Sequence, residues 1–134
     1  MAISEHIPIK ADTDVLAARQ KGRALGLQAG FASIDITLLA TAISELARNI
    51  LLYAREGEIE LRLLHEGGRR GVMVVASDQG PGIADIERAL QDGFSTSGGL
   101  GLGLPGVKRL MDSFEIRSLP GQGTVVTAVK WELR

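Results

Sequence analysis

The sequence predicts an α+β fold, a two-layer sandwich in which helices cover one face of a mixed, mainly antiparallel sheet. Three observations predict it. Apolar residues recur at helical spacing over residues 36–54, the pattern changes to strict alternation after Gly57, and two pairs of strand-like segments are joined by short connections. Helices grouped apart from runs of strands are typical of α+β domains. With 134 residues, 45% of them hydrophobic, we expect a single domain over residues 1–134.

The N-terminal half is predicted to contain one edge strand and two helices. Residues 3–9 form the strand, and Asp12 or Thr13 caps an Ala-, Leu- and Arg-rich helix that closes at Gly30. A second helix follows, in which the apolar residues recur three and four positions apart: Ile36, Leu39, Ile43, Leu46, Ile50 and Ala54. This pattern is the clearest helix signal in the chain.

The C-terminal half is predicted to form two β-hairpins with two short helices between them. The strands are expected over residues 59–63, 72–76, 114–118 and 124–133, and the helices over residues 85–90 and 104–111. Gly67 to Gly71 is expected to turn the chain in the first hairpin. We expect Tyr53 and Trp131 to serve the core, and the two histidines, His6 and His65, to be surface residues.

Charge and composition limit the partners. A net charge of -1 and a pI of about 6.1 supply no attraction toward nucleic acid or anionic lipid. The absence of cysteine excludes disulfides, thiolate zinc sites and cysteine nucleophiles. The sequence has no basic, apolar leader at residues 1–9 and no run of about 18 apolar residues. We therefore expect a cytoplasmic protein without a nucleic-acid or membrane partner.

Glu45 and Asn49 are the first candidate site residues. Residues four apart on a helix point the same way, so a carboxylate and an amide one turn apart can share a ligand. An amide oxygen suits Mg²⁺, and a neighbouring carboxylate can orient or deprotonate a nucleophile. The alternative is that Glu45 pairs with Arg48 while Asn49 lies on a solvated face.

Asp78 is the second candidate, because it ends a predicted buried strand. A carboxylate there needs a donor, and an adenine amino group would suit. Gly80 and Gly82, on either side of Pro81, allow close backbone approach and positive φ. The alternative is an ordinary Asp-containing turn.

The glycine-rich stretch from Gly98 to Gly103 is the third candidate. It leads into a predicted helix, and free amide groups at a helix start attract phosphate. The alternative is a flexible loop. The spacing of Gly101, Gly103 and Gly106 imitates a dinucleotide-binding turn, but no apolar strand precedes it. P-loop and ordinary protein-kinase motifs are missing as well.

The order of these three motifs resembles that of the Bergerat-fold (GHKL) ATPases and kinases. Within that superfamily, the strings at residues 41–49, 92–99 and 104–112 closely resemble the RsbT-type serine/threonine kinases of the bacterial stressosome, and the likeness spans almost the whole chain. The resemblance implies a Bergerat fold, ATP and Mg²⁺ as cofactors, STAS-domain scaffold or antagonist proteins as substrates, and a PP2C-type phosphatase or other downstream regulator as an activated partner.

The resemblance also implies a role for each motif residue. Glu45 would be the catalytic base or positioning group, Asn49 would hold Mg²⁺ against the phosphates, and Asp78 would accept the adenine amino group. The remaining nucleotide-binding residues would be Gly80, Gly82, Gly99, Gly101, Gly103 and Thr124. Unlike many relatives, the stretch from Gly93 to Gly103 contains no Lys or Arg. Mg²⁺ and backbone amides would then neutralise the phosphates, unless Arg48, Lys108 or a partner contributes.

The sequence therefore predicts an enzyme that transfers phosphate from MgATP to a serine or threonine hydroxyl of another protein in a stress-response or related signalling pathway. One alternative is a nucleotide-dependent, anti-sigma-like binding module that regulates a partner by sequestration. Another is an ATP hydrolase whose nucleotide cycle drives dimerisation.

Overall fold

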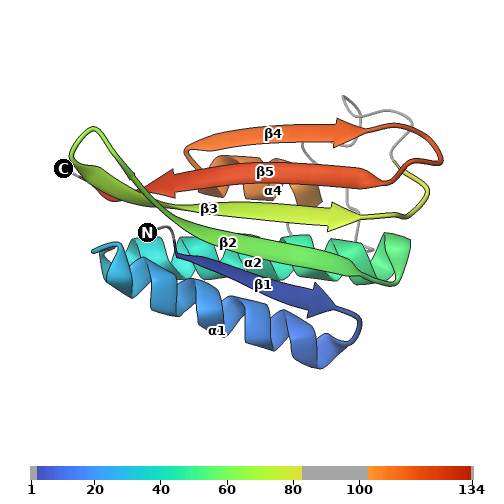
Figure 1. Cartoon of the computed structure of the whole chain (residues 1–134), viewed down its shortest axis with the longest axis horizontal. Helices are drawn as coiled ribbons and strands as arrows, with labels where there is room; N and C mark the ends of the chain where they lie inside the picture. Colours follow the sequence, from blue (N-terminus) through green and yellow to red (C-terminus); the bar gives the residue numbers. More distant parts are fainter. Residues whose placement is uncertain (1–2, 83–102, 134) are drawn as a thin grey trace.

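The computed structural model describes residues 3–82 and 103–133, and these residues form an α+β sandwich (Figure 1). The elements in chain order are β1 (Ser4–Ile9), α1 (Asp12–Gln28), α2 (Ser33–Ala54), β2 (Gly57–Glu66), β3 (Arg69–Asp78), α4 (Gly103–Leu110), β4 (Ser113–Ser118) and β5 (Thr124–Trp131). The predicted helix at residues 85–90 lies outside the described residues, as does most of the glycine-rich stretch.

The five strands form one sheet in the order β1-β2-β3-β5-β4. Every pairing between these strands is antiparallel, in agreement with the predicted mainly antiparallel sheet. Both hairpins have the predicted antiparallel connection. The first is longer than expected, because Gly67 and Gly68, with φ of 60° and 78°, make a two-residue turn. Pairing therefore begins at Glu66 and Arg69.

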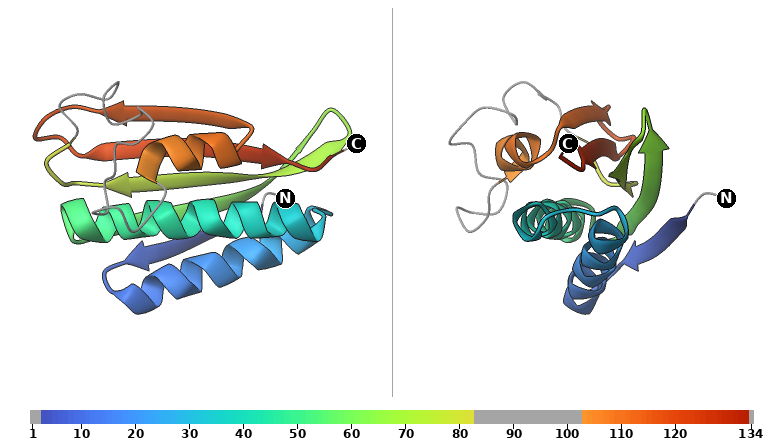
Figure 2. Two further views of the ribbon diagram at one scale, coloured as in Figure 1. Left: turned by 180° about the vertical axis from the view of Figure 1, so that it is seen from behind. Right: turned by 90° about the vertical axis from the view of Figure 1, so that its left-hand side faces the viewer.

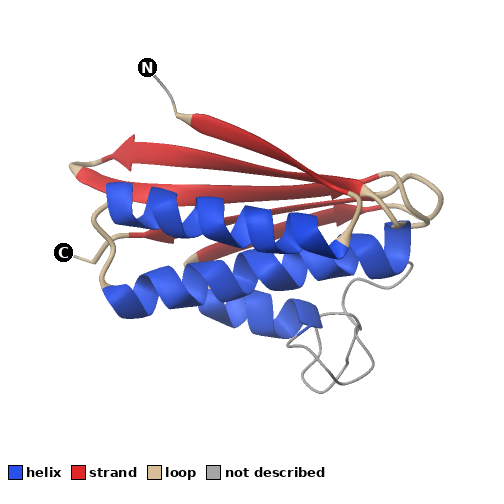
Figure 3. Cartoon of the chain, turned by 90° about the horizontal axis from the view of Figure 1, so that it is seen from below, coloured by secondary structure: helices blue, strands red, loops and turns tan. Residues whose placement is uncertain are grey.

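The three helices lie side by side on one face of the sheet, with α2 between α1 and α4 (Figure 2). The core fills the space between these helices and the sheet. Its largest fully buried apolar side chains are Ile9, Leu39, Ile43, Ile59, Leu61, Val72, Val74 and Val107. Among the described elements, no helix covers the opposite face of the sheet (Figure 3).

Helix α2 is the central helix of the layer that covers the sheet. Its apolar stripe, predicted from the sequence, faces the core, and Leu39 and Ile43 are completely buried. By length and composition alone this helix could also cross a membrane, with a mean hydropathy of 1.3. More than half of that window, 56%, is buried inside the protein. Its apolar character is therefore explained by its place between two helices and a sheet.

Two expectations for individual residues were wrong. Helix α1 begins at Asp12 itself, and its start is capped by Asp14, whose Oδ2 accepts the backbone N–H groups of Lys10 (2.9 Å) and Ala11 (3.1 Å). Tyr53 does not serve the core, since it is 50% exposed near the end of α2. Trp131 is half-buried, with the guanidinium of Arg69 4.7 Å from its ring centre.

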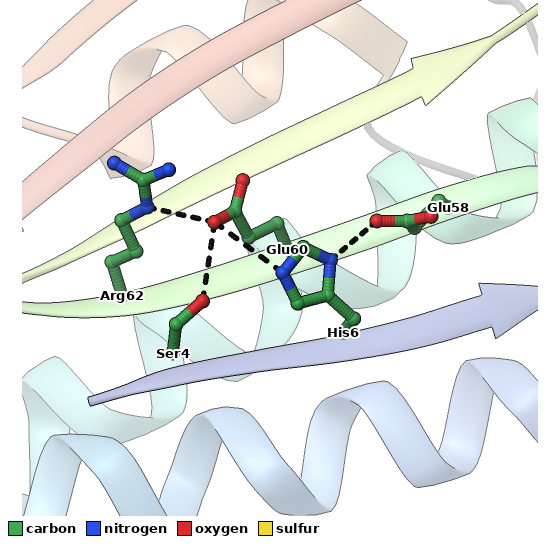
Figure 4. A network of polar contacts seen from close by, with 5 residues as sticks. All are labelled: Ser4, His6, Glu58, Glu60 and Arg62. Carbon is green, nitrogen blue, oxygen red and sulfur yellow. Dashed lines mark hydrogen bonds and ion pairs between the residues drawn. The ribbon is translucent and has the colours of Figure 1, made fainter. Parts of the chain in front are cut away.

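The open face of the sheet has a polar network over β1 and β2 (Figure 4). The Nδ1 of His6 lies 2.6 Å from Glu58 Oε1, and its Nε2 lies 3.6 Å from Glu60 Oε2. Glu60 also accepts hydrogen bonds from Ser4 (3.1 Å) and Arg62 (2.7 Å). His6 is thus a surface residue as predicted, with acidic neighbours supplied by the adjacent strand.

Candidate functional site

Glu45 is a buried carboxylate in the middle of α2, only 2% exposed. A charged group in such a place needs hydrogen-bond donors. One oxygen, Oε1, accepts the backbone N–H of Gly103 at 3.0 Å. The other, Oε2, lies 3.5 Å from Nη1 of Arg48, a longer and weaker contact with a half-exposed side chain. The structure thus brings together two predicted site residues that are 58 positions apart.

Gly103 stands at the start of α4 with a φ of 66°. This left-handed conformation is accessible to glycine and strained for other residues. Because its amide points at Glu45, the carboxylate fixes where the glycine-rich stretch meets the helix. The i,i+3 pairing of Glu45 with Arg48, the alternative named from the sequence, is present too, and the catalytic role of Glu45 stays a prediction.

Asn49 lies one helical turn beyond Glu45 and is half-buried. The next residue, Ile50, packs so closely on Gly57 at the start of β2 that a Cβ on this glycine would lie 2.8 Å from the Ile50 side chain. Gly57 pairs in turn with Asp78 at the end of β3. The amide on the helix and the carboxylate on the sheet are therefore held at the same end of the molecule.

Asp78 occupies the last position of β3, between Gly57 on β2 and Thr124 on β5. By the two-residue period of a strand, its side chain lies on the same face as the buried Ala76, which is the face toward the helices. Its Oδ1 accepts the backbone N–H of Gly80 at 2.9 Å. Among residues 3–82 and 103–133, no hydrogen-bond donor to its Oδ2 is present.

The glycines around Asp78 are required by close backbone packing. A Cβ on Gly80 would lie 2.6 Å from the Cβ of Ala54, the last residue of α2. A Cβ on Gly82 would overlap the carbonyl oxygen of Leu119, and one on Gly123 would overlap that of Asp78 itself. These contacts fix the turn after β3 against α2 and the β4–β5 turn. Contact of Gly80 and Gly82 with a nucleotide stays a prediction.

Thr124 lies directly opposite Asp78 in the β3–β5 pairing. Its Oγ1 is 2.8 Å from the hydroxyl of Ser118, and Ser118 donates its proton to the carbonyl of Gly123 at 3.0 Å. A hydroxyl has one proton, so Thr124 is the donor in the first contact and its remaining lone pairs point elsewhere as acceptors. Sequence reasoning missed Ser118, although its pairing with Thr124 follows from the hairpin register.

The other predicted residues divide into two groups. Gly99 and Gly101 lie outside the described residues. Of the two cations considered for the phosphates, Arg48 reaches Glu45, whereas Lys108 is an exposed residue in the last turn of α4. Arg48 is therefore the cation that the described structure brings to the site.

The residues present fit Mg²⁺ bound together with a nucleotide better than a metal held by protein alone. Residues 3–82 and 103–133 contain no cluster of three or more His, Asp or Glu side chains able to hold a metal ion. Mg²⁺ normally keeps several waters and takes only one or two protein ligands besides substrate phosphates. A single amide such as Asn49, beside a carboxylate that is already hydrogen-bonded, meets that requirement.

Comparisons with known proteins show the family of the chain. The family described as histidine kinase-, DNA gyrase B- and HSP90-like ATPase matches residues 34–134. The serine/threonine-protein kinase RsbT of Bacillus subtilis is 52% identical over 125 residues, which are 93% of this chain and 94% of that protein. An anti-sigma F factor of a Thermoanaerobacter species is 33% identical over 103 residues, covering 72% of this chain and 71% of that protein.

A solved structure shows the same fold. The crystal structure of the RsbU and RsbW domains of a Mycobacterium tuberculosis protein matches with a TM-score of 0.66 at 19% identity. The match covers 96% of this chain and 32% of that chain, so the present chain spans about a third of it. The chain therefore belongs to the histidine kinase-, DNA gyrase B- and HSP90-like (GHKL) ATPase family, and within it to the serine/threonine-protein kinases of the RsbT type.

Proposed function

We propose that the chain is a switch kinase of the cytoplasm, which transfers the γ-phosphoryl group of ATP to a serine or threonine hydroxyl of a STAS-domain stressosome protein. In the same proposal it activates a PP2C-type phosphatase or another downstream regulator in a stress-response pathway. The observation that carries the proposal is the buried Glu45 carboxylate, which is anchored by the Gly103 amide one turn before Asn49.

We assign to Glu45 the role of orienting the acceptor hydroxyl and accepting its proton. Its Oε1 is fixed by the Gly103 N–H at 3.0 Å, so the carboxylate has a defined orientation. Among the residues that the structure describes, its Oε2 has only the long contact with Arg48, and in this proposal it receives the proton of the incoming hydroxyl. Phosphoryl transfer relies mainly on positioning and electrostatics, so orienting the hydroxyl is as important as removing its proton.

We assign to Asp78 the recognition of the adenine ring of the nucleotide. Its Oδ1 accepts the backbone N–H of Gly80, and in this proposal its Oδ2 accepts the exocyclic amino group of adenine. Thr124, whose proton goes to Ser118, would act there as an acceptor, for a water or for the amino group itself. Both positions favour a ligand that donates hydrogen bonds, as the amino edge of adenine does.

Asn49 is the residue we assign to the metal, through its side-chain oxygen. When bound, MgATP supplies the phosphoryl group and the cation that offsets its charge. Arg48 is the described side chain best placed to add a further positive charge, because it already lies beside Glu45.

A second function, regulation of a partner by binding alone, is favoured by one observation. One relative is named an anti-sigma F factor, and it is 33% identical over 72% of this chain. The two functions differ in what they require of Glu45. Sequestration needs an intact nucleotide site and docking surface, whereas phosphoryl transfer also needs the carboxylate.

The proposal is tested by incubating the protein with labelled ATP, Mg²⁺ and candidate STAS-domain proteins. We expect label on a serine or threonine of one candidate, dependent on Mg²⁺. Binding of the candidate without any transfer would support the sequestering function instead. Partner-independent release of phosphate would indicate an ATP hydrolase.

A further inference from the structure

Lys130 is a buried cation that the proposed mechanism does not use. It lies on β5 and is only 7% exposed. Its Nζ donates a hydrogen bond to the backbone carbonyl of Leu110 at 2.9 Å and lies 3.9 Å from Oδ1 of Asp35. A buried ammonium is costly without such partners. Lys130 therefore depends on α4 and α2 for its place in the core.

Both charges of this pair suit the helix ends that they meet. Leu110 is the last residue of α4, where unpaired carbonyls carry partial negative charge, and Lys130 supplies a positive charge there. Asp35 lies in the first turn of α2, where free amides favour an anion. The pair thus joins the end of α4, the start of α2 and strand β5 at one point of the core.

The ion pair itself is loose. At 3.9 Å, Oδ1 of Asp35 is beyond hydrogen-bonding distance of the ammonium. Oδ2 of Asp35 is buried, and within the described ranges of the chain it has no hydrogen-bond partner. Replacing a buried pair of this kind with apolar side chains is often neutral or stabilising. Stability alone therefore does not account for the pair, and its firm contact is the hydrogen bond from Lys130 to α4.

Two further hydrogen bonds hold the same end of α4 to β5. The backbone N–H of Asp112 donates to the carbonyl of Val129 at 2.8 Å, and Oδ2 of Asp112 accepts the backbone N–H of Trp131 at 2.7 Å. Three consecutive residues of β5 thus bind the segment 110–112. We call these three hydrogen bonds, with that of Lys130 included, the β5 clamp.

Helix α4 needs such anchoring because it is short. It has eight residues, with Pro105 and Gly106 in its first half, and a helix of this length is marginal by itself. Its buried side chains Leu104 and Val107 are apolar, and apolar contacts are non-directional. They hold α4 against the core without fixing its position along its own axis. The β5 clamp supplies that restraint.

The other end of α4 reaches the site of the proposed chemistry. Its first residue, Gly103, donates its backbone N–H to Oε1 of Glu45 at 3.0 Å. A helix behaves as a rigid element, so a shift of the clamped end of α4 is carried to Gly103. The β5 clamp and Glu45 therefore hold opposite ends of one short rod.

We propose that Lys130 is a positioning residue for phosphoryl transfer. By binding the carbonyl of Leu110 it fixes the place of α4, and α4 in turn fixes where the Gly103 amide meets Glu45. Asp35 keeps the ammonium of Lys130 oriented toward α4. The inference rests on the proposed kinase function, in which Glu45 orients the acceptor hydroxyl. It adds a residue from the end of β5, outside the three nucleotide motifs.

The first test observes the Gly103 amide in the free protein by NMR. Lys130→Met removes the hydrogen bond to Leu110 but leaves a buried Asp35 without its cation, so it is combined with Asp35→Leu. In this double variant the Gly103 amide proton should move upfield and exchange with solvent about tenfold faster, because its hydrogen bond to Glu45 is weakened. Lys130→Arg, which can still donate to the Leu110 carbonyl, should keep the wild-type signal.

A second variant of the β5 clamp lies at the surface. Asp112 is exposed, and Asp112→Ala removes the hydrogen bond to the Trp131 amide without opening the core. The Gly103 signal should move in the same direction as in the double variant. This variant keeps the test decisive if the double variant does not fold.

The second test measures steady-state kinetics with the STAS-domain protein that accepts phosphate. The double variant should lower kcat about ten- to a hundredfold, because small misplacements of a positioned group have effects of this size. The KM for that protein should stay within about threefold of the wild type, since no docking surface is changed. Lys130→Arg should keep kcat close to that of the wild type.

Leu61→Ala is the matched control for lost stability. Leu61 is completely buried on β2, which β3 separates from β5. Urea unfolding shows whether this variant loses at least as much stability as the double variant, and its Gly103 signal and kcat should nevertheless stay near those of the wild type. Arg117→Met removes an exposed ion pair with Glu115 on the neighbouring strand β4 and should change neither quantity.

The remaining outcomes are distinguishable. An unchanged Gly103 signal in the folded clamp variants would overturn the inference, and so would an equal loss of kcat in Leu61→Ala. If the wild type phosphorylates no STAS-domain protein, the proposed function fails, and the role of Lys130 in transfer fails with it even where the Gly103 signal responds. If transfer is intact in the wild type and in the double variant alike, only the role of Lys130 is refuted.

Discussion

Glu45→Gln and Glu45→Ala should separate the catalytic role of this carboxylate from its structural role. Glutamine keeps the volume of the side chain and its carbonyl oxygen can still accept the Gly103 N–H, which is now 3.0 Å from Oε1. Alanine leaves that amide unpaired next to a position only 2% exposed, at a cost of about 1–3 kcal/mol, and adds a cavity. Only alanine should therefore lower stability substantially.

Both variants should lose phosphoryl transfer. Removing a general base or positioning carboxylate costs about 10²–10⁴-fold in rate, and 10²-fold corresponds to about 2.7 kcal/mol of barrier. The Kd for ATP of Glu45→Gln should stay within about threefold of the wild type, because the assigned contacts of the base and the metal are intact.

Single-turnover transfer to a STAS-domain protein, ATP titration calorimetry and urea unfolding measure these three quantities separately. The reasoning would be refuted by Glu45→Gln transferring phosphate at the wild-type rate. It would also be refuted by Glu45→Gln and Glu45→Ala losing equal stability, because the Gly103 hydrogen bond would then not matter.

Three further predictions follow from the geometry. Gly123→Ala should lower the free energy of unfolding by about 1–3 kcal/mol more than Gly121→Ala. Both glycines have φ near 80°, but only a Cβ on Gly123 would overlap the backbone of Asp78. Equal losses of stability in urea titrations would contradict this. Asp78→Asn should keep the Gly80 hydrogen bond yet weaken ATP binding about tenfold or more by calorimetry; undiminished affinity would remove Asp78 from the base site. The hydrogen bond to Glu58 raises the pKa of His6 above 6.5. The contribution of this pair to the stability of the fold is therefore present at low pH and is lost as the pH rises through the raised pKa. An NMR titration should show a lower pKa of His6 in Glu58→Gln.

Much of the fold could be predicted because its signals are local. The stripe along α2 specifies a helix with one buried face, and the alternation after Gly57 specifies a strand, whatever the rest of the chain does. The short connections then allow only hairpins. The order of the strands in the sheet was not predicted, because it depends on contacts that no short stretch encodes.

The sequence named candidate site residues but not the contacts among them. The spacing of Glu45 and Asn49 follows from helix geometry, whereas the hydrogen bond from Gly103 joins residues 58 positions apart. Gly80 was expected to approach a ligand, and the structure explains it by its contact with Ala54. Tyr53 was placed in the core because of its size, yet it projects from the end of α2 and is 50% exposed.

The most direct test of the central claim is to locate the transferred phosphate by mass spectrometry after incubation with MgATP and the STAS-domain partner. We expect phosphate on one serine or threonine of the partner, present with the wild type and lost with Glu45→Gln. Unchanged phosphorylation by Glu45→Gln, or phosphate found only in solution with an unmodified partner, would contradict it.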